Sequence, residues 1–412
     1  MQSEIILKII KWYYRKGRQI VGKAYILGGI RSDIGIENGK YCNIPVEKLG
    51  AAVFKQLLEK YSIEPEKIDL VIAGNAVGAG GNLTRLMLLE SEIGKDIPAV
   101  TVDVQCGSGL ESIALAAAKI QSGQADVVIA GGFESSSTAP RRSYHPNHPD
   151  YEKYGGKDNW YRVAKFVPEY HHEQVMLEGA EHTAVTEKIT REEMDAWALL
   201  SHKRAVKARE DHVLEDCIVS VTGDLPKDEG IRDRMSERLL KRLPPVLKEG
   251  SLITAGNACL THDGAAFVIL CSEKFHQTYQ ARTGKQAQAF FVQVAESAGD
   301  PMKSPLTAIT AIERLLAKAD ICPEQIAAWE CNEAFAVIDV LFERHFPKQV
   351  KDYNIFGGAL AYGHPYGASG GMILLHLLKA LQNRNGKYGI CSIAAAGGVG
   401  TALLVQRMND AR

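Results

Sequence analysis

Two segments of this chain repeat each other, and the repetition limits the folds that the chain can adopt. The residues IEPEKIDLVIAGN (63–75) and ICPEQIAAWECNE (321–333) share Ile, Pro, Glu and Ile at a constant offset. A second pair, CGSGLESIALAAAK (106–119) and GASGGMILLHLLKA (367–380), matches in the same way. Such repeats predict two copies of one folding unit, packed about a pseudo-twofold axis with matching turns that face each other.

Each copy follows a pattern of alternating strands and helices. In the first copy, strands are expected at 25–29, 68–73, 99–104 and 125–130, and helices at 46–61 and 84–92. The run ADVVIA in the last strand is continuously apolar, as in strands that are covered on both faces. This alternation predicts an α/β fold with a layered, largely parallel sheet.

The domain boundaries are expected where this alternation stops and resumes. Residues 23–139 and 252–280 would form the first half, and residues 281–412 the second half. Residues 140–251 break the pattern and are interpreted as an inserted loop subdomain.

The insert is rich in Tyr, His, Lys and Arg, which suit contacts with a large anionic substrate and equally suit a solvated loop face. One clear helix is predicted within it, at 191–209. Thr190 and Glu193 form a capping box at the start of that helix.

Residues 1–22 differ in composition from the rest of the chain. Their isoleucines and Tyr13 form a helical stripe that is surrounded by Lys and Arg. Such a basic amphipathic extension could contact an anionic membrane surface or a partner, or it could pack against the body or fray.

Composition excludes several classes of function. A net charge of −1 argues against bulk electrostatic binding of nucleic acid. The 8 cysteines include no Cys-x-x-Cys pair, so neither a metal site nor a disulfide framework is predicted, and a reducing cytoplasm fits best. No apolar run reaches the roughly 18 residues that a membrane-spanning helix needs.

Cys106 lies at a predicted turn from strand to helix, in VDVQCGSGLESIALAAAKI (102–120). At the positive end of a helix dipole a thiolate is favoured, and free N–H groups there can bind an oxyanion. The neighbouring glycines allow a sharp turn and a close substrate. Cys106 is therefore a candidate nucleophile for acyl transfer, although an isolated cysteine is also often a small buried hydrophobe.

Two polar residues in the second copy could complete the site. His364, in GGALAYGHPYGASGG (357–371), lies at a second glycine-rich turn and could accept the proton of Cys106. Asn332, in CNEAFAV (331–337), could orient His364 or hold a water, or it could cap the following helix. The pseudo-symmetry brings all three residues toward one pocket.

Taken together, these motifs resemble the thiolase family. From about Ala24 to the C-terminus the chain contains, in family order, CGSGLESI, ADVVIAGGFES, ITAGNACLTHDGAA, CNEAFAV, GHPYGASGG and AAAGGVGTALL. The resemblance implies a five-layered αβαβα fold and acyl-CoA chemistry, with CoA as substrate or product and no other cofactor. It also implies a homodimer or homotetramer and a place in fatty acid or lipid metabolism.

Residue roles can be carried over by position. Cys106 resembles the acyl-accepting nucleophile, His364 its base, and Asn332 the residue whose bound water forms one oxyanion hole. The backbone N–H groups of Cys106 and Ala396 resemble the second hole. Three further residues resemble ones that border the acyl and CoA pockets: Met176, Cys259 and Phe335.

The chain departs from the family pattern at the second catalytic cysteine. Thiolases usually carry it in a C-terminal Cys-x-Gly-Gly-Gly loop, where it moves a proton at the α-carbon. The loop here is CSIAAAGGVG, which places Ala394 at that position. Cys391 lies three residues earlier, an odd offset on a strand, so its side chain is expected on the opposite face unless a bulge intervenes. Cys259 replaces a common serine, and Val175 a common histidine.

We therefore expect a thiolase-type acyltransferase that forms an acyl-Cys106 intermediate from acyl-CoA or 3-ketoacyl-CoA. The acyl group would pass to CoA in thiolysis or to an acyl-CoA carbon in Claisen condensation. Two alternatives are a C-acyltransferase with a non-CoA acceptor and a non-catalytic partner protein with the same fold.

Overall fold

The computed structural model describes residues 22–408 except residues 155, 159 and 169. Apart from Gly22, the extension predicted at 1–22 lies outside the described residues.

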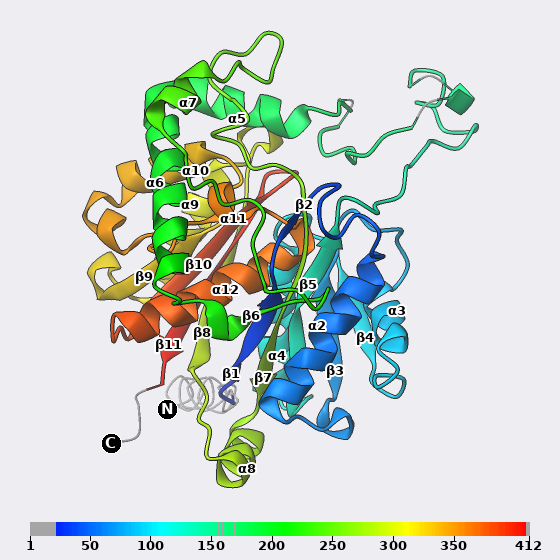
Figure 1. Cartoon of the computed structure of the whole chain (residues 1–412), viewed down its shortest axis with the longest axis vertical. Coiled ribbons are helices and arrows are strands. Elements are labelled where there is room, and N and C mark those ends of the chain that lie inside the picture. The colour runs from blue at the N-terminus through cyan, green and yellow to red at the C-terminus, as the bar shows by residue number, and fades with distance from the viewer. Residues whose placement is uncertain (1–21, 155, 159, 169, 409–412) are drawn as a thin grey trace, which may run out of the picture.

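An 11-stranded sheet carries both copies of the repeat, in the order β4-β3-β5-β7-β1-β8-β11-β10-β9 (Figure 1). The two halves join only where β1 pairs with β8, through Tyr25 with Phe290 and Ile26 with Ala289. The strands are β1 (Tyr25–Ser32), β2 (Gly35–Ile36), β3 (Leu70–Gly74), β4 (Ala99–Val102), β5 (Val127–Ser135), β6 (Ile218–Val219), β7 (His262–Cys271), β8 (Ala289–Ala298), β9 (Ile326–Cys331), β10 (Tyr388–Ala395) and β11 (Val399–Arg407).

The helices form three layers around the two halves of the sheet. The main helices are α2 (Val46–Tyr61), α3 (Leu83–Glu90), α4 (Ser108–Gln121), α5 (Val175–Thr186), α6 (Arg191–Glu210), α7 (Glu237–Arg242), α8 (Glu273–Thr283), α9 (Leu306–Ala319), α10 (Ala336–His345) and α12 (Tyr366–Asn383). α4 and α12 pack between the halves, and their apolar side chains share one cluster with residues of both half-sheets.

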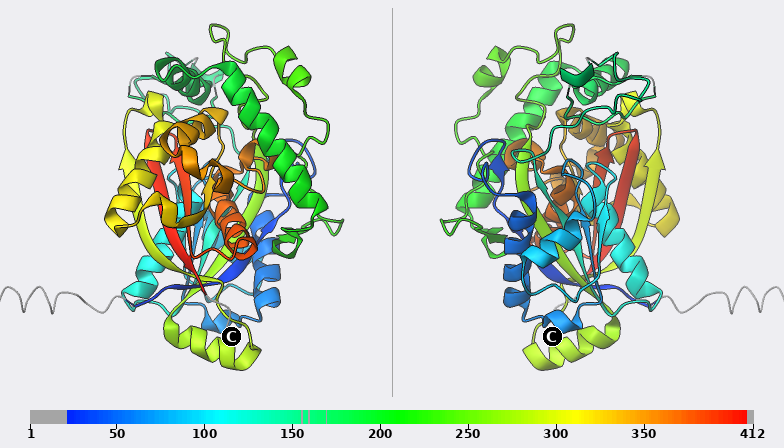
Figure 2. Two further views of the ribbon diagram at one scale, coloured as in Figure 1. Left: turned by 90° about the vertical axis from the view of Figure 1, so that its left-hand side faces the viewer. Right: turned by 90° about the vertical axis from the view of Figure 1, so that its right-hand side faces the viewer.

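Two further apolar clusters complete the layering. The first joins α2 and α3 to the outer face of the first half-sheet, and the second joins α9 and α10 to the outer face of the second. The order helix, sheet, helix, sheet, helix confirms the predicted five layers, which Figures 1 and 2 show from three sides.

The middle layer is packed unusually closely because glycines meet at its centre. A Cβ on Gly109 of α4 would lie 2.5 Å from the carbonyl oxygen of Gly367, and one on Gly370 of α12 would lie 2.0 Å from the backbone nitrogen of Leu110. Real Cβ atoms do not approach backbone so closely, so only glycine lets the two helix starts touch. This contact brings the turns that carry Cys106 and His364 together.

The expected strands and helices are present, with ends that differ by a few residues. α2 spans the predicted residues, and α6 begins with the predicted capping box, in which Glu193 N–H donates to Thr190 Oγ1 at 3.2 Å. The repeated segments also correspond: a short 3₁₀ turn precedes β3 at Pro65–Lys67 and β9 at Pro323–Gln325.

The expectation of a largely parallel sheet was wrong. β3 pairs in parallel with β4 and β5, and β9 with β10, but the central pairs β5–β7, β7–β1, β1–β8, β8–β11 and β11–β10 are antiparallel. The physical reason is that strands covered on both faces are continuously apolar in either direction, so their pattern does not encode strand direction.

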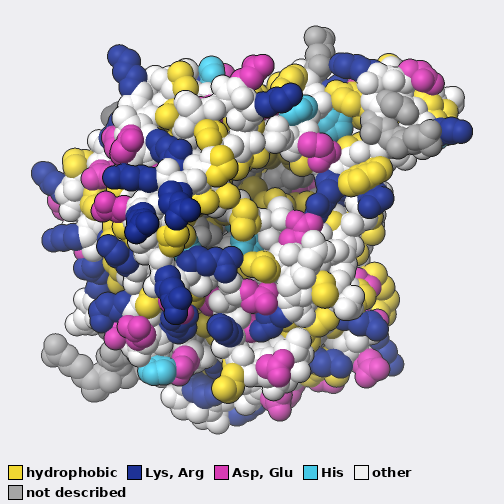
Figure 3. Space-filling model, turned by 45° about the horizontal axis from the view of Figure 1, so that its top comes forward, with side chains coloured by type: hydrophobic (Ala, Val, Ile, Leu, Met, Phe, Trp, Pro, Cys, Tyr) yellow, Lys and Arg dark blue, Asp and Glu magenta, His cyan; other side chains and the backbone are white. Residues whose placement is uncertain are grey.

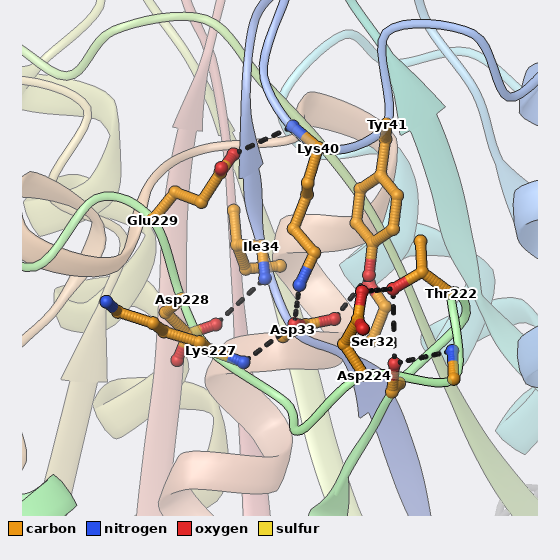
Figure 4. Close-up of polar contacts among 12 residues, drawn as sticks. Ser32, Asp33, Ile34, Lys40, Tyr41, Thr222, Asp224, Lys227, Asp228 and Glu229 are labelled. Carbon is orange, nitrogen blue, oxygen red and sulfur yellow. Dashed lines mark hydrogen bonds and ion pairs between the residues drawn. The ribbon is translucent and has the colours of Figure 1, made fainter.

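The segment between β5 and β7 carries α5, α6 and α7 and is fastened to the body by buried polar contacts. Figure 4 shows two of them, Asp228 with Ile34 and Lys227 with Asp33. Asp228 forms a bidentate ion pair with Arg31 of β1, at 2.8 and 2.9 Å, and accepts the Ile34 N–H at 2.8 Å. Asp33 accepts the Lys227 N–H at 2.7 Å and also contacts Lys40. The Arg31–Asp228 pair helps to hold this segment in one place, since removal of either partner would leave an uncompensated buried charge.

Within the described part of the chain, no helix is long and apolar enough to cross a membrane.

Candidate active site

Cys106 lies on a tight elbow between β4 and α4. Gln105, just before it, has a left-handed φ of 51°, and the Asp103 carboxylate accepts the Gln105 N–H at 2.9 Å. Ser108 Oγ donates to the Gln105 carbonyl at 2.6 Å and accepts the Val104 N–H at 2.8 Å. A non-glycine residue in this conformation stores strain that the surrounding contacts must hold, as is common at functional sites.

The glycines beside Cys106 act differently from the sequence expectation. Gly107 has an ordinary right-handed φ of −75°, so the sharp turn rests on Gln105. The glycine that the site requires is Gly109, because it permits the contact between α4 and α12 described above.

The thiol of Cys106 is held in its neutral form. Burial raises the pKa of Cys106 to about 12, against the opposing effect of hydrogen bonds from the N–H groups of Ala396 and of Cys106 itself. The expectation that the helix end would favour a thiolate is therefore wrong for this unliganded site, because the loss of water outweighs the nearby donors. Both N–H groups nonetheless point at the sulfur, beside the place where the carbonyl oxygen of an acyl group on Cys106 would lie.

The protonation of the His364 ring follows from its contacts. Nδ1 lies 2.6 Å from Ser369 Oγ, and the Ser369 hydroxyl lies 3.0 Å from the Pro365 carbonyl oxygen. Because a carbonyl can only accept, the hydroxyl proton goes to Pro365 and Nδ1 must carry the proton that Ser369 accepts. Nε2 is then left with a free lone pair, as a base requires.

Asn332 approaches that free nitrogen. Its Nδ2 lies 3.4 Å from His364 Nε2, which is a long contact, and burial lowers the pKa of His364 to about 3. The His364 ring is thus neutral at ordinary pH. Asn332 does not cap α10, whose N-cap is Phe335, so the alternative reading as a helix cap is wrong.

The glycine-rich turn at His364 was expected to join a strand to a helix, but the chain before it is a short helix, α11 (Ala359–Tyr362). Gly363 follows with a φ of 113°, and a Cβ there would lie 2.3 Å from the His262 ring. The buried Glu333 side chain braces this loop by accepting the Leu360 N–H at 3.2 Å and the Ser201 hydroxyl at 2.6 Å.

Glu134 connects the loop after β3 to the start of α12 and was missed by the sequence reasoning. It is buried at the end of β5 and accepts N–H groups from Ala76 at 2.8 Å and from Gly367 at 3.0 Å. Burial raises the pKa of Glu134 to about 7. A charged residue at the end of the apolar run ADVVIAGGF was the signal available in the sequence. Ser369, which supports the His364 ring, was also missed.

A cavity of about 390 Å³ lies over the elbows, and most of the candidate residues line it. Figure 3 shows hydrophobic side chains around a hollow on this face of the molecule. The lining includes Cys106, His364, Met176, Cys259, Phe335, Ala394, Ala396, Tyr366, Arg142 and Arg162. Asn332 is not part of the lining and reaches the site through His364.

Cys391 lies away from this cavity. It is fully buried and packs in the middle-layer cluster, whereas Ala394 packs in the cluster on the other face of the sheet and lines the cavity. β10 pairs with β11 without a bulge between these residues, so their odd offset places them on opposite faces. The suggestion that Cys391 supplies the acid/base group therefore has no support in this geometry.

Among the described residues, no group of three or more His, Cys, Asp or Glu side chains is placed to hold a metal ion.

Comparison with known proteins agrees with this geometry. The family model for the thiolase N-terminal domain matches residues 24–274, and that for the thiolase C-terminal domain matches residues 285–407. A mitochondrial acetyl-CoA acetyltransferase of Gibberella zeae is 33% identical over 409 residues, which cover 95% of this chain and 93% of the relative.

Solved structures show the same likeness. The acetyl-CoA acetyltransferase of Bacillus anthracis superposes with a TM-score of 0.85 at 29% identity and covers 94% of this chain and 100% of its own. Human mitochondrial 3-ketoacyl-CoA thiolase in complex with CoA gives a TM-score of 0.84 at 31% identity. The match covers 95% of this chain and 99% of the human chain. With both domain models matched and the elbows, cavity and layers in place, the chain belongs to the thiolase family.

Proposed function

We propose that this thiolase-family acyltransferase carries its acyl group on Cys106. His364 Nε2 takes the thiol proton as the sulfur attacks the thioester or 3-keto carbonyl of the substrate. The observation that carries this proposal is the His364 ring, whose Nδ1–H is committed to Ser369 and whose unprotonated Nε2 has only the long Asn332 contact, in the lining of the cavity that Cys106 also lines.

Two sets of donors would stabilise the negative oxygen that forms during attack. The N–H groups of Cys106 and Ala396 already point at the sulfur and suit the tetrahedral oxyanion on the acyl carbon. Protonated His364 and the Asn332 amide, alone or through a water, suit the carbonyl oxygen of the second substrate. Each such donor typically contributes about 10²- to 10³-fold in rate.

The acyl group is then transferred to CoA or to the α-carbon of a second acyl-CoA. Support comes from the solved thiolase with CoA and from the names of the relatives. CoA is in this proposal a substrate or product, and no resident cofactor takes part. The same relatives favour CoA chemistry over a non-CoA acceptor or a non-catalytic role.

Incubation with acetyl-CoA followed by intact-protein mass measurement tests the proposal. The wild-type chain should gain one acetyl group, and Cys106→Ala should gain none. Cys322→Ser removes an exposed cysteine and is the matched control, which should acetylate normally. Absence of an adduct with acetyl-CoA and with longer acyl-CoA thioesters would refute acyl transfer through Cys106.

A homodimer formed through the β4 edge of the sheet is part of this proposal. β4 ends the sheet, so one side of its backbone has no strand partner in the described chain. Exposed apolar side chains lie on β4 and on the neighbouring α3 and α4, including Leu89, which is 48% exposed, and Val100, which is 46% exposed. An apolar open edge of this kind is a natural site for a second copy.

We place the enzyme in a reducing compartment such as the cytoplasm. The support is that all of the cysteines are free thiols, including the exposed Cys322.

A further inference from the structure

The carbon–carbon half of the reaction needs a group that moves a proton at the α-carbon, and the family position for that group is Ala394. The Ala394 side chain is a methyl group, and Cys391 lies on the far face of β10. Any proton carrier must therefore come from elsewhere in the cavity lining. The described lining contains two thiols, Cys106 and Cys259.

Cys259 is held firmly in that lining. Its N–H donates to the Ala334 carbonyl at 3.0 Å, and Ala258 beside it forms an antiparallel bridge with Phe335. Asn257 braces the same loop by accepting the Thr254 N–H at 2.8 Å. The Cys259 side chain packs against the apolar cluster that contains Ala394, and both residues line the same cavity.

Cys259 also senses the charge state of Cys106. Burial raises the pKa of the Cys259 thiol most strongly, and the neighbouring Cys106 raises it further. Acylation makes Cys106 a thioester that cannot ionise, so this repulsion cannot arise while the acyl group is bound. Cys259 therefore faces no negative charge from Cys106 during the step at the α-carbon.

The other titratable groups of the lining fit the role less well. His364 Nε2 serves the sulfur of Cys106, and Glu173 is exposed and accepts the Arg162 N–H at 2.9 Å. Burial raises the pKa of the Tyr366 phenol, whose ring meets the His364 ring edge to face at 5.0 Å. Tyr366 remains the one competitor that an experiment must separate.

We propose that Cys259 is the acid/base residue for the α-carbon, in place of the missing cysteine at position 394. Before condensation the Cys259 thiol gives its proton to His364 Nε2, which is unprotonated again once the first CoA has left as a thiol. The Cys259 thiolate then takes an α-proton from bound acetyl-CoA, and the C–H electron pair becomes the enolate. The enolate carbon attacks the acyl carbon on Cys106, the new C–C bond forms, and the C–S bond breaks with Cys106 leaving as thiolate, which takes the proton back from His364. In cleavage the same thiol returns its proton to the enolate that departs. This role rests on the proposed acyl transfer through Cys106.

The test separates the two half-reactions in the full-length protein. Acetylation of Cys106 is followed by intact mass, and α-proton exchange is followed as deuterium uptake into acetyl-CoA in D₂O. Thiolysis of acetoacetyl-CoA by CoA gives a third readout. The variants are Cys259→Ser, Tyr366→Phe, and Cys259→Ser combined with Ala394→Cys.

For Cys259→Ser we expect acetylation within about fivefold of wild type, while exchange and thiolysis fall by about 10²- to 10⁴-fold, as when a positioned acid/base is lost. In the double variant with Ala394→Cys, the rates of exchange and thiolysis should be at least tenfold higher than in Cys259→Ser alone. A merely structural role for Cys259 would not predict this recovery. Normal acetylation of Cys259→Ser also shows that the variant is folded.

Several results would overturn the proposal. Exchange that persists in Cys259→Ser and disappears in Tyr366→Phe would move the role to the phenol. A parallel loss of acetylation and exchange in Cys259→Ser would assign Cys259 to the first half-reaction. A wild-type protein that acetylates without exchange would refute the inference and leave acyl transfer intact, whereas absence of the adduct would refute both.

Discussion

At the scale of single residues, the candidate site consists of neutral partners held ready for proton transfer. The Cys106 thiol and the His364 imidazole are both uncharged in the resting protein, because burial penalises the charged form of each. In the proposed reaction the proton therefore moves as the sulfur attacks, and a preformed thiolate–imidazolium pair is not required. Ser369 fixes which ring nitrogen receives that proton.

This pairing predicts a flat pH profile for acetylation. His364 is neutral at any pH well above its pKa of about 3, and Cys106 keeps its proton at any pH well below about 12. Both reactive forms are thus populated throughout the neutral range. The rate of adduct formation from acetyl-CoA should change by less than about threefold between pH 5.5 and 9. A steep rise with a midpoint near pH 8 would instead mean that a free thiolate must form first.

Replacement of Ser369 by alanine should disturb the ring without removing it. The Nδ1–H would lose its acceptor, so the tautomer with the proton on Nε2 becomes competitive and the free lone pair is lost for part of the population. We expect acetylation to slow by about 10- to 100-fold, measured by mass-resolved kinetics. Ser112→Ala removes another buried hydroxyl, which donates to the Ser108 carbonyl, and should leave the rate near wild type. Equal rates in the two variants would contradict the role of Ser369.

The sequence predicted the principal residues of the site better than it predicted their supports. Cys106 and His364 stand out because each lies in a glycine-rich motif at matching places of a repeat. Glu134 acts through a contact that depends on the folded path of the chain, because it lies 233 residues from Gly367. Ser369 contacts His364 from only five residues away, but this contact depends on how the chain turns into α12. A left-handed Gln105 also has no signature in sequence, because its conformation is imposed by its surroundings.

At the scale of elements, the crossing of α4 and α12 sets the position of the site. Each helix starts at an elbow that carries one reactive residue, and the glycines at the crossing let backbone touch backbone. The distance between the reactive residues is therefore governed by helix packing more than by their own side chains.

A single methyl group at this crossing should be costly. In Gly109→Ala the new Cβ would lie 2.5 Å from the Gly367 carbonyl oxygen, so the two helices must separate. Overpacking of this kind typically destabilises a protein by about 1–3 kcal/mol. We expect that loss in urea unfolding, together with a fall in acetylation of at least tenfold.

Gly107→Ala is the matched control for that prediction. A Cβ at Gly107 would lie 3.3 Å from the Val104 carbonyl oxygen and 3.6 Å from the Ala395 Cβ, which requires only a small adjustment. Its φ of −75° also suits alanine. If both variants unfolded at the same urea concentration and reacted alike, helix crossing would not control the site.

The positions of the helices and strands along the chain were predictable from the sequence, but the relative directions of paired strands were not. The apolar run at 125–130 correctly predicted a covered strand, observed as β5, but gave no information on its antiparallel partner β7. Likewise, the glycines before His364 predicted a turn, and the short helix α11 that fills the space is decided by contacts such as Leu360 N–H with Glu333.

At the scale of the whole molecule, two half-sheets enclose one layer of helices, so polar groups in that layer have little access to water. His376 of α12 is one such group: it is buried, its Nε2 has no hydrogen-bond partner among the described residues, and burial lowers its pKa to about 3. The unfolded chain binds the proton near pH 6.5, whereas the folded chain resists it. The stability that neutral His376 contributes is therefore present above pH 6.5 and is lost as the pH falls toward 3.

The loss of folding stability in acid should depend in part on His376. Between pH 7 and pH 5, protonation of His376 in the unfolded chain alone should lower the free energy of unfolding by roughly 2 kcal/mol, at 1.36 kcal/mol for each pH unit below 6.5. His376→Leu should show a pH dependence that is shallower by about this amount in urea unfolding at the two pH values. Buried carboxyl groups such as Glu134 are common to both proteins and cancel in the comparison. Identical slopes would contradict the prediction.

The proposed dimer can be tested at the same scale. Val100→Lys places a charge on the open edge of β4, and the cost of burying that charge should shift a dimer to monomer in sedimentation experiments. Leu225→Lys changes another highly exposed apolar residue, far along the insert, and should leave the assembly unchanged. A wild-type chain that sediments as a monomer would refute the interface.

The cavity wall has two origins: Cys106 and His364 stand on the repeated halves, while Met176, Leu177 and Phe166 come from the segment between β5 and β7. Substitutions in the segment between β5 and β7 can thus change the cavity wall, while the packing of the two repeated halves keeps Cys106 and His364 in place. A chimera that exchanges this segment with that of a relative should inherit the acyl-length preference of the donor and keep the recipient's rate of bond making.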